Sequence, residues 1–278
     1  MRLGGPVLEE FSDPESWVSA LRRAGFRAAF CPVGNDAGQD VIAAYADAAE
    51  AADILIAEVG AWSNPLSDDE SERRQAVTHC QKQLALADQI GARCCVNVTG
   101  SRGTRWAGPH PQNLTDETFR MIVESVQSIL DEVKPTRTFY TLETMPWMYP
   151  DSADSYLRLI KAIDRRQFAV HLDPVNLINC PQRYFENAAL LRDCFRKLGP
   201  LIKSCHAKDI VLADELTVHL DEVAPGQGTL DYTVYLRELN KLDADTPLML
   251  EHLKAGVEYA RAAAHIRSVA AEAGVTIH

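Results

Sequence analysis

The chain has 278 residues, of which 46% are hydrophobic and 24% are charged, and its formal net charge is -11 at pH 7. These proportions are typical of a folded globular domain and exclude a disordered chain. Because the acidic charge repels polyanions, it argues against nucleic acid or an anionic membrane as the main partner, and a small, mostly neutral molecule fits better.

Short apolar runs alternate with longer segments of helical periodicity along the chain. This alternation predicts parallel strands joined by crossover helices. The eight predicted strands are residues 2–4, 27–31, 53–59, 93–98, 138–143, 168–173, 202–206 and 247–251. Capping residues followed by acids predict helix starts near residues 12, 67 and 113, and Gly25 and Gly91 are expected to end helices.

No linker, repeat or low-complexity tract divides the chain, so we predict one domain over residues 1–278. Eight strand–helix units most simply close into a single (β/α)8 TIM barrel, a fold of about 250 residues. The longest segments without periodicity are 99–112 and 210–228, and loops of that length are usually functional. Within the second, Gly226-Gln227-Gly228 predicts a tight turn.

The location of the protein is expected to be cytoplasmic. The seven cysteines are scattered and odd in number, which favours free thiols over a disulfide framework. The N-terminus lacks the apolar stretch of a secretory signal, and no run is long enough to span a membrane.

Four predicted strands end on side chains that can bind metal: Glu143, Asp173, His206 and Glu251. An ionised carboxylate that leaves water costs several kcal/mol unless a cation or hydrogen-bond donors meet it. In a barrel these strand ends lie on the face where active sites form. Three carboxylates and an imidazole could therefore converge there on one divalent ion.

The motifs around these residues resemble the sugar isomerase/epimerase superfamily of xylose isomerase-like TIM barrels, which is related to endonuclease IV. The resemblance is sharpest at Leu142-Glu143, Leu172-Asp173, His206-Ala207-Lys208-Asp209, residues 225–232 and Leu250-Glu251-His252. It implies a divalent metal bound by Glu143, Asp173, His206 and Glu251, for which we expect Mn²⁺, with Mg²⁺, Co²⁺ or Zn²⁺ as alternatives. In the epimerases of this superfamily the two glutamates also exchange protons with a ketose.

The expected chemistry follows from this arrangement. A metal that binds a carbonyl and the neighbouring hydroxyl acidifies the adjacent C–H, so that a carboxylate can remove the proton and leave an enediolate. Glu143 and Glu251 are placed for opposite faces of one ligand. Return of the proton to the same carbon gives epimerisation, and return to the next carbon interconverts aldose and ketose.

An isomerase or epimerase of a sugar or keto-sugar is the first hypothesis. The alternative is a metal-dependent lyase on the same scaffold, either a keto-polyol dehydratase or a C-glycoside-cleaving enzyme. The third hypothesis, an endonuclease IV-like phosphodiesterase, is disfavoured by the acidic charge and by the few histidines at strand ends. No arginine cluster accompanies the site, which argues against phosphorylated substrates. We also expect a homo-oligomer.

Six further residues are candidates for substrate contact: His171, Asn176, Lys208, Trp62, Trp106 and Trp147. His171 shares the inward face of Asp173, where a core histidine is an equal alternative. Lys208 shares the face of His206 and needs an anion or a substrate oxygen. Many relatives carry a histidine where this chain has Asn176.

The three tryptophans follow strands, and aromatic rings suit the apolar side of a sugar. Loop anchors are the alternative interpretation for them. Glu58 and His252 are weaker candidates for the site, and Asp209 is expected to be a structural partner within its loop.

Overall fold

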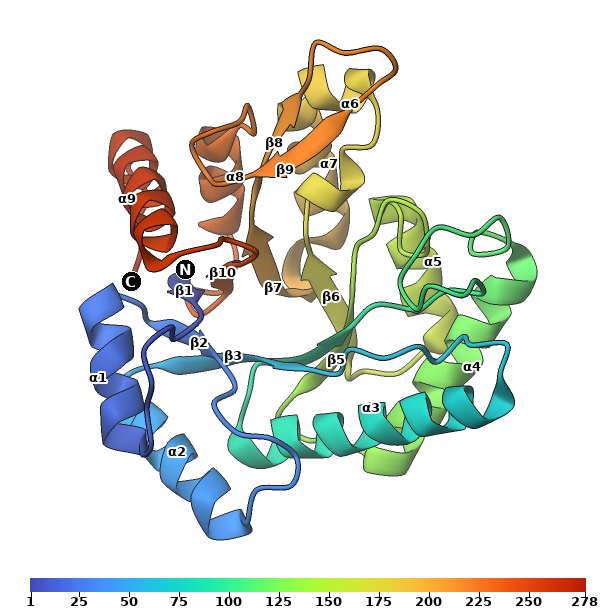
Figure 1. The fold of residues 1–278 in the computed structure, drawn as a ribbon, viewed down its shortest axis with the longest axis horizontal. Coiled ribbons are helices and arrows are strands. Elements are labelled where there is room, and N and C mark those ends of the chain that lie inside the picture. Colours follow the sequence, from blue (N-terminus) through green and yellow to red (C-terminus); the bar gives the residue numbers. More distant parts are fainter.

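Eight parallel strands pair edge to edge into a closed barrel in the computed structural model, which describes residues 1–278 (Figure 1). The barrel strands are β1 (Arg2–Gly5), β2 (Ala28–Phe30), β3 (Leu55–Gly60), β4 (Cys94–Asn97), β5 (Phe139–Glu143), β6 (Phe168–Leu172), β7 (Ile202–Ala207) and β10 (Pro247–Leu250). Their order around the barrel is β1-β10-β7-β6-β5-β4-β3-β2. The predicted (β/α)8 fold is confirmed, with strand ends displaced by one or two residues.

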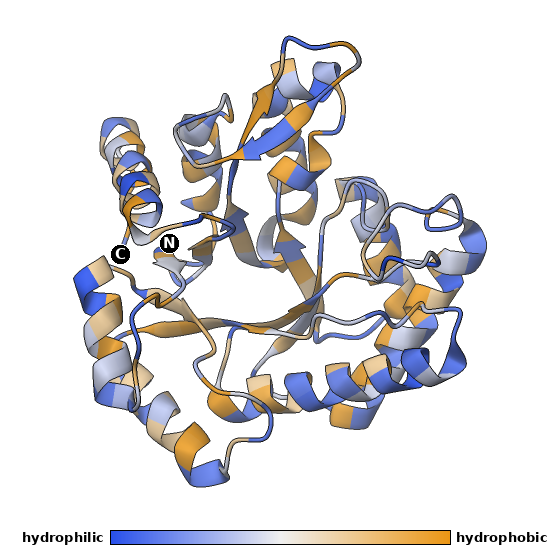
Figure 2. Ribbon diagram, in the orientation of Figure 1, coloured by the Kyte–Doolittle hydropathy of each residue, from blue (hydrophilic) through white to orange (hydrophobic).

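Helices surround the barrel, and the short helix Pro181–Phe185 packs beside the helix that follows it in the chain. They are α1 (Pro14–Ala24), α2 (Gln39–Ala51), α3 (Glu70–Ile90), α4 (Asp116–Val133), α5 (Ala153–Ile163), α6 (Pro181–Phe185), α7 (Asn187–Leu198), α8 (Tyr232–Leu239) and α9 (Gly256–Ala273). Figure 2 shows hydrophobic and hydrophilic residues along the same helices, as an amphipathic outer layer requires. On α4, for example, Ile122, Val126 and Ile129 are buried. None of the helices combines the length and hydrophobicity of a membrane span.

The predicted helix ends are confirmed by their capping contacts. The side chains of Asp13, Asp69 and Thr115 each accept the backbone N–H three residues ahead. Gly25 and Gly91 adopt left-handed φ angles of 70° and 76° after α1 and α3. A residue with a Cβ would be strained there, which explains glycine at both stops.

The loop predicted over residues 210–228 contains regular structure that the sequence pattern did not reveal. Strands β8 (Asp209–Leu212) and β9 (Leu220–Val223) form an antiparallel hairpin that is separate from the barrel sheet. In Figure 1 the hairpin projects beyond β7, near α6. The prediction of an irregular segment was therefore wrong for these two strands.

A single buried carboxylate fastens the base of this hairpin. Asp209 Oδ1 accepts the N–H groups of Ile210 and Leu230, both at 2.9 Å, and Oδ2 accepts those of Gly226 and Gly228, both at 3.0 Å. Gly226 has a φ of 89°, and a Cβ on Gly228 would lie 2.4 Å from Asp209 Oδ1. The predicted tight turn and the structural role of Asp209 are both confirmed.

We expect Asp209→Ala to lower the free energy of unfolding by about 3 kcal/mol or more, because several backbone N–H groups would lose their acceptor. Urea unfolding measures the loss, and hydrogen exchange should show lost protection of the Gly226 and Gly228 amides. The matched control is Asp221→Ala at an exposed position of the same hairpin, where a change within about 0.5 kcal/mol is expected. Equal stability of the two variants would contradict the anchoring role.

Candidate metal centre and active site

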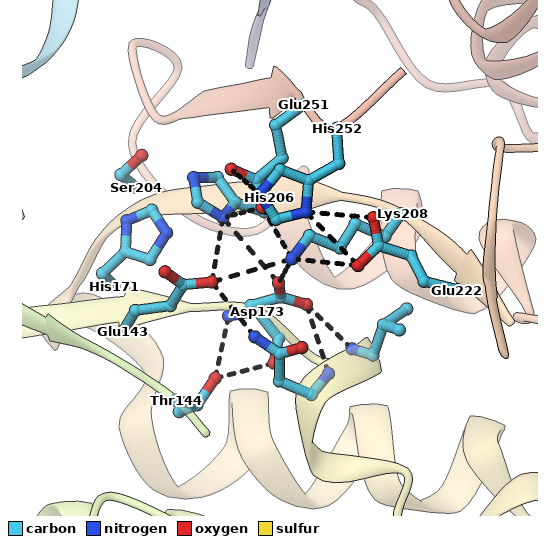
Figure 3. A network of polar contacts seen from close by, with 12 residues as sticks. Glu143, Thr144, His171, Asp173, Ser204, His206, Lys208, Glu222, Glu251 and His252 are labelled. Atoms are coloured by element: carbon cyan, nitrogen blue, oxygen red, sulfur yellow. Dashed lines mark hydrogen bonds and ion pairs between the residues drawn. The ribbon is translucent and has the colours of Figure 1, made fainter. Parts of the chain in front are cut away.

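Four side chains predicted as metal ligands meet at the carboxyl end of the barrel (Figure 3). Glu143 ends β5, and His206 lies near the end of β7, while Asp173 and Glu251 directly follow β6 and β10. One ligand atom from each lies within 4.8 Å of all the others. His206 Nδ1 is 2.8 Å from Glu251 Oε1, 3.3 Å from Glu143 Oε1 and 3.7 Å from Asp173 Oδ2. Four adjacent strands of the barrel thus contribute to one cluster.

The donor set of this cluster suits a divalent cation. Carboxylate oxygens and an imidazole nitrogen are ligands that Mn²⁺, Mg²⁺, Co²⁺ and Zn²⁺ accept in various proportions. Asp173 Oδ2 and Glu251 Oε1 are buried and accept no hydrogen bond of good geometry. Because three largely buried carboxylates meet here beside a single lysine ammonium, a cation at this point would supply positive charge that these oxygens lack. The cluster can therefore hold a divalent metal ion.

The ammonium group of Lys208 enters the same cluster. Its Nζ is 2.7 Å from both Asp173 Oδ2 and Glu251 Oε1, and the residue is 2% exposed. Burial alone would lower the pKa of Lys208, but the carboxylates of Asp173, Glu143 and Glu251 outweigh it and raise that pKa well above its ordinary value. The expectation that Lys208 shares the face of His206 and meets an anion is confirmed, and its contact with substrate stays a prediction.

The two glutamates of the cluster have pKa values shifted in opposite directions. Burial raises the pKa of Glu143 above its ordinary value. Burial acts in the same sense on Glu251, but His206 and Lys208 outweigh it and lower the pKa of Glu251 to about 2. Carboxyl groups whose environments separate their pKa values in this way are suited to act as proton donor and proton acceptor.

Hydrogen bonds orient the acidic ligands. Thr144 Oγ1 donates to the Asp173 carbonyl oxygen at 2.6 Å and accepts the Asp173 N–H at 3.0 Å. Asp173 Oδ1 accepts the N–H of Val175 at 3.0 Å. Asn176 Nδ2 donates to Glu143 Oε1 at 3.1 Å. Asn176 is thus in direct contact with a predicted ligand.

A second buried group lies on the other side of the His206 ring. Glu58 of β3 is 2% exposed, accepts a hydrogen bond from Ser204 Oγ, and has Oε2 3.4 Å from His206 Nε2. His171 Nδ1 is 3.5 Å from Glu58 Oε1, and the His171 and His206 rings lie 4.1 Å apart between centroids. His171 is fully buried, and neither of its nitrogens has a hydrogen-bond partner. Glu58, a weaker candidate in the sequence, therefore lies in direct contact with His206, the histidine predicted as a metal ligand.

Three tyrosines that were not predicted as site residues position the strand ends. Tyr235 donates its hydroxyl to the His206 carbonyl oxygen, and Tyr232 donates to that of Lys208, both at 2.8 Å. Tyr156 donates to the Leu142 carbonyl oxygen at 2.6 Å. Tyr232 closes the motif of residues 225–232, whereas in the sequence Tyr156 and Tyr235 have the appearance of ordinary members of apolar helix faces.

The tryptophans lie outside the ligand cluster. Trp62, Trp106 and Trp147 are 45%, 46% and 39% exposed in loops. Trp147 Nε1 donates to the Ala107 carbonyl oxygen at 2.9 Å, which joins the loops after β5 and β4. Their contact with substrate stays a prediction. His252 lies at the rim, 60% exposed in its side chain, with Nδ1 3.1 Å from Glu222 Oε1.

Solved structures share this fold at low sequence identity, and no curated protein matches the sequence significantly. The probable 3-DHS dehydratase AsbF from Bacillus anthracis is 16% identical with a TM-score of 0.72, over 97% of this chain and 98% of that one. D-psicose 3-epimerase from Clostridium cellulolyticum, solved with D-tagatose, is 14% identical with a TM-score of 0.70, over 97% and 99%. Endonuclease IV from Thermus thermophilus is 14% identical with a TM-score of 0.73, over 98% and 100%.

At such identities these structures are evidence for the fold alone, since proteins with three different activities share it. The family is identified by sequence. A family model described as xylose isomerase-like TIM barrel matches residues 18–269, which is most of the chain. The protein therefore belongs to the xylose isomerase-like TIM barrel family.

Proposed function

We propose that this protein is a divalent-metal-dependent isomerase or epimerase of a sugar or keto-sugar, with Glu143 and Glu251 as its acid–base pair. The observation that carries the proposal is the convergence of both glutamates with Asp173 and His206 in one buried cluster. The opposite pKa shifts of the glutamates support their different roles. The shared fold of D-psicose 3-epimerase supports the class of substrate.

A divalent cation, when bound, would polarise the substrate carbonyl and make the neighbouring C–H more acidic. In one direction Glu251 accepts that proton as a carboxylate and Glu143 returns a proton from the other side, and the reverse reaction exchanges the roles. Lys208 supplies positive charge beside the substrate oxygen on which negative charge develops. The buried setting of Glu143 and Lys208 keeps water from competing for the proton.

A DNA phosphodiesterase is a poorer fit to this chain. The proposed ligand set contains one imidazole among four groups. The net charge of -11 opposes approach of a polyanion. A lyase would use the same proton removal on a substrate that carries a leaving group on the β carbon, so the two reactions are separated by their products.

With Mn²⁺ in D₂O, we expect the protein to incorporate deuterium beside the carbonyl of at least one sugar in a panel of ketoses and 3-keto sugars. Glu143→Gln and Glu251→Gln should each slow this exchange about 100-fold or more, because an amide cannot transfer the proton. Proton NMR and mass spectrometry measure the exchange.

The control for this experiment is Glu272→Gln at an exposed position of α9, which should exchange at the wild-type rate. Wild-type rates in both active-site variants would refute the acid–base assignment. Loss of water or of an aglycone without an epimerised product would assign a lyase, and cleavage of abasic DNA would overturn both assignments.

We expect Glu58→Gln to weaken Mn²⁺ binding about 10- to 100-fold, because a carboxylate behind a ligand histidine fixes its tautomer and ring orientation. Glu58 Oε2 lies 3.4 Å from His206 Nε2 and would hold the ring proton there when Nδ1, which faces the carboxylate cluster, binds a cation. Isothermal titration calorimetry measures the affinity, and nitrogen coupling to Mn²⁺ in pulsed EPR reports whether His206 is bound.

Glu58→Asp, which keeps the charge, should retain more affinity than Glu58→Gln, and Glu272→Gln should bind Mn²⁺ as the wild type does. Circular dichroism checks that each variant is folded. Unchanged affinity and unchanged nitrogen coupling in folded Glu58→Gln would show that Glu58 does not position the ligand.

A further inference from the structure

A groove of about 610 Å³ opens beside the metal cluster, between the loop after β5, the turn after β6 and the β8–β9 hairpin. Its apolar lining consists of six side chains: Trp147, Val175, Ile178, Ile210, Val218 and Leu220. This volume lies within the range of about 300–1,000 Å³ that is usual for small-molecule sites. The groove is therefore large enough for a substituent in addition to the sugar at the metal.

Two polar residues of the groove lining also contact the cluster. Asn176 lines the groove and donates to Glu143 Oε1 at 3.1 Å. Glu222 also lines it and has Oε2 3.4 Å from Lys208 Nζ. The groove thus borders the cluster at Asn176 and Glu222, and a substituent that passes these two side chains would reach the apolar lining.

The chemistry of the lining selects the kind of substituent. No lysine, arginine or histidine lines the groove, and its only charged residue is Glu222. An anionic group such as a phosphate would meet no cation there and would face a carboxylate. Apolar surface, by contrast, would leave water on contact with Val218, which is 55% exposed, and Trp147, which is 39% exposed.

Trp147 is held in an orientation that allows such a contact. Its indole Nε1 donates to the Ala107 carbonyl oxygen at 2.9 Å, so the ring is held while part of its surface stays accessible. A ring that is already fixed loses little conformational entropy on binding. Flat apolar or aromatic groups are the partners that such a ring binds best.

We propose that this groove is a subsite for an apolar or aromatic group attached to the sugar, so that the substrate class is a glycoside or keto-glycoside with such a group. The inference rests on the proposed function, because it takes the sugar itself to be held at the metal cluster. It specifies that function further, since a free or phosphorylated sugar would leave the apolar lining unused.

Matched methyl and phenyl glycosides of several sugars, titrated calorimetrically into the Mn²⁺-loaded protein, test the proposal. We expect the phenyl member to bind at least about 10-fold more tightly than the methyl member in at least one sugar series. Trp147→Ala and Val218→Asp should each abolish that preference. The control is Val41→Asp on α2, an exposed valine at 47%, which should preserve the preference.

Equal affinities within every pair, including the case in which neither member binds, would overturn the subsite. Tighter binding of a sugar phosphate than of the same sugar would overturn it too. A concentration-dependent dimer that Val218→Asp dissociates, measured by light scattering, would instead show that a second copy of the chain covers the groove.

Failure of the subsite can be told apart from failure of the proposed function. Val41→Asp, which lies outside both the cluster and the groove, should retain Mn²⁺ affinity and deuterium exchange into a free ketose within about twofold. If the wild type shows metal binding and exchange but no phenyl preference, only the subsite is refuted. If the wild type shows neither metal binding nor exchange, the proposed function fails independently of the groove.

Discussion

Negative charge concentrated in a buried space is the constraint on which the site depends. Glu143, Asp173 and Glu251 approach one another at the mouth of the barrel, where carboxylates without compensation would cost several kcal/mol each. Lys208 and His206 supply the compensation. The same electrostatic demand makes the cluster receptive to a divalent cation, because the oxygens that need positive charge are already assembled.

His206 connects this cluster to Glu58, which lies on the other side of its ring. Its Nδ1 faces the three carboxylates, while its Nε2 faces Glu58. Burial alone would lower the pKa of His206, but Glu251, Glu58 and Glu143 outweigh it and raise that pKa well above its ordinary value. A ring held between acids on both edges has little freedom to rotate, so the ligand nitrogen is oriented by charge as well as by packing.

Much of this arrangement was predictable because its signals are local. A strand that ends on Glu143 or Glu251 breaks an apolar run with a charge, and the barrel topology brings such ends to one face. The motif after His206 likewise places Lys208 on the same side of the chain. The positions of these charged residues follow from strand periodicity and strand order, and both can be predicted from the sequence pattern.

The remaining features depend on tertiary contacts. Strands β8 and β9 have four residues each, and the Asp221-Glu222 pair interrupts any alternation in β9, so pairing rather than pattern defines the hairpin. Glu58 lies inside an apolar strand, and its carboxylate is satisfied by Ser204 and His206 of the distant strand β7. In the sequence, Glu58 stands out only as a charged residue within an apolar run. Its partners could not be recognised, because they lie more than a hundred residues away in the chain.

The adjacency of Lys208 and Asp209 has an evolutionary consequence. Lys208 belongs to the charged cluster, while the next residue commits both of its carboxylate oxygens to the hairpin base. The far end of the hairpin closes on itself, as in the Ala213 N–H bond to the His219 carbonyl oxygen at 2.9 Å. The exposed residues 214–218 beyond that bond can therefore vary without disturbing β7, so the hairpin tip can change while the charged cluster is kept.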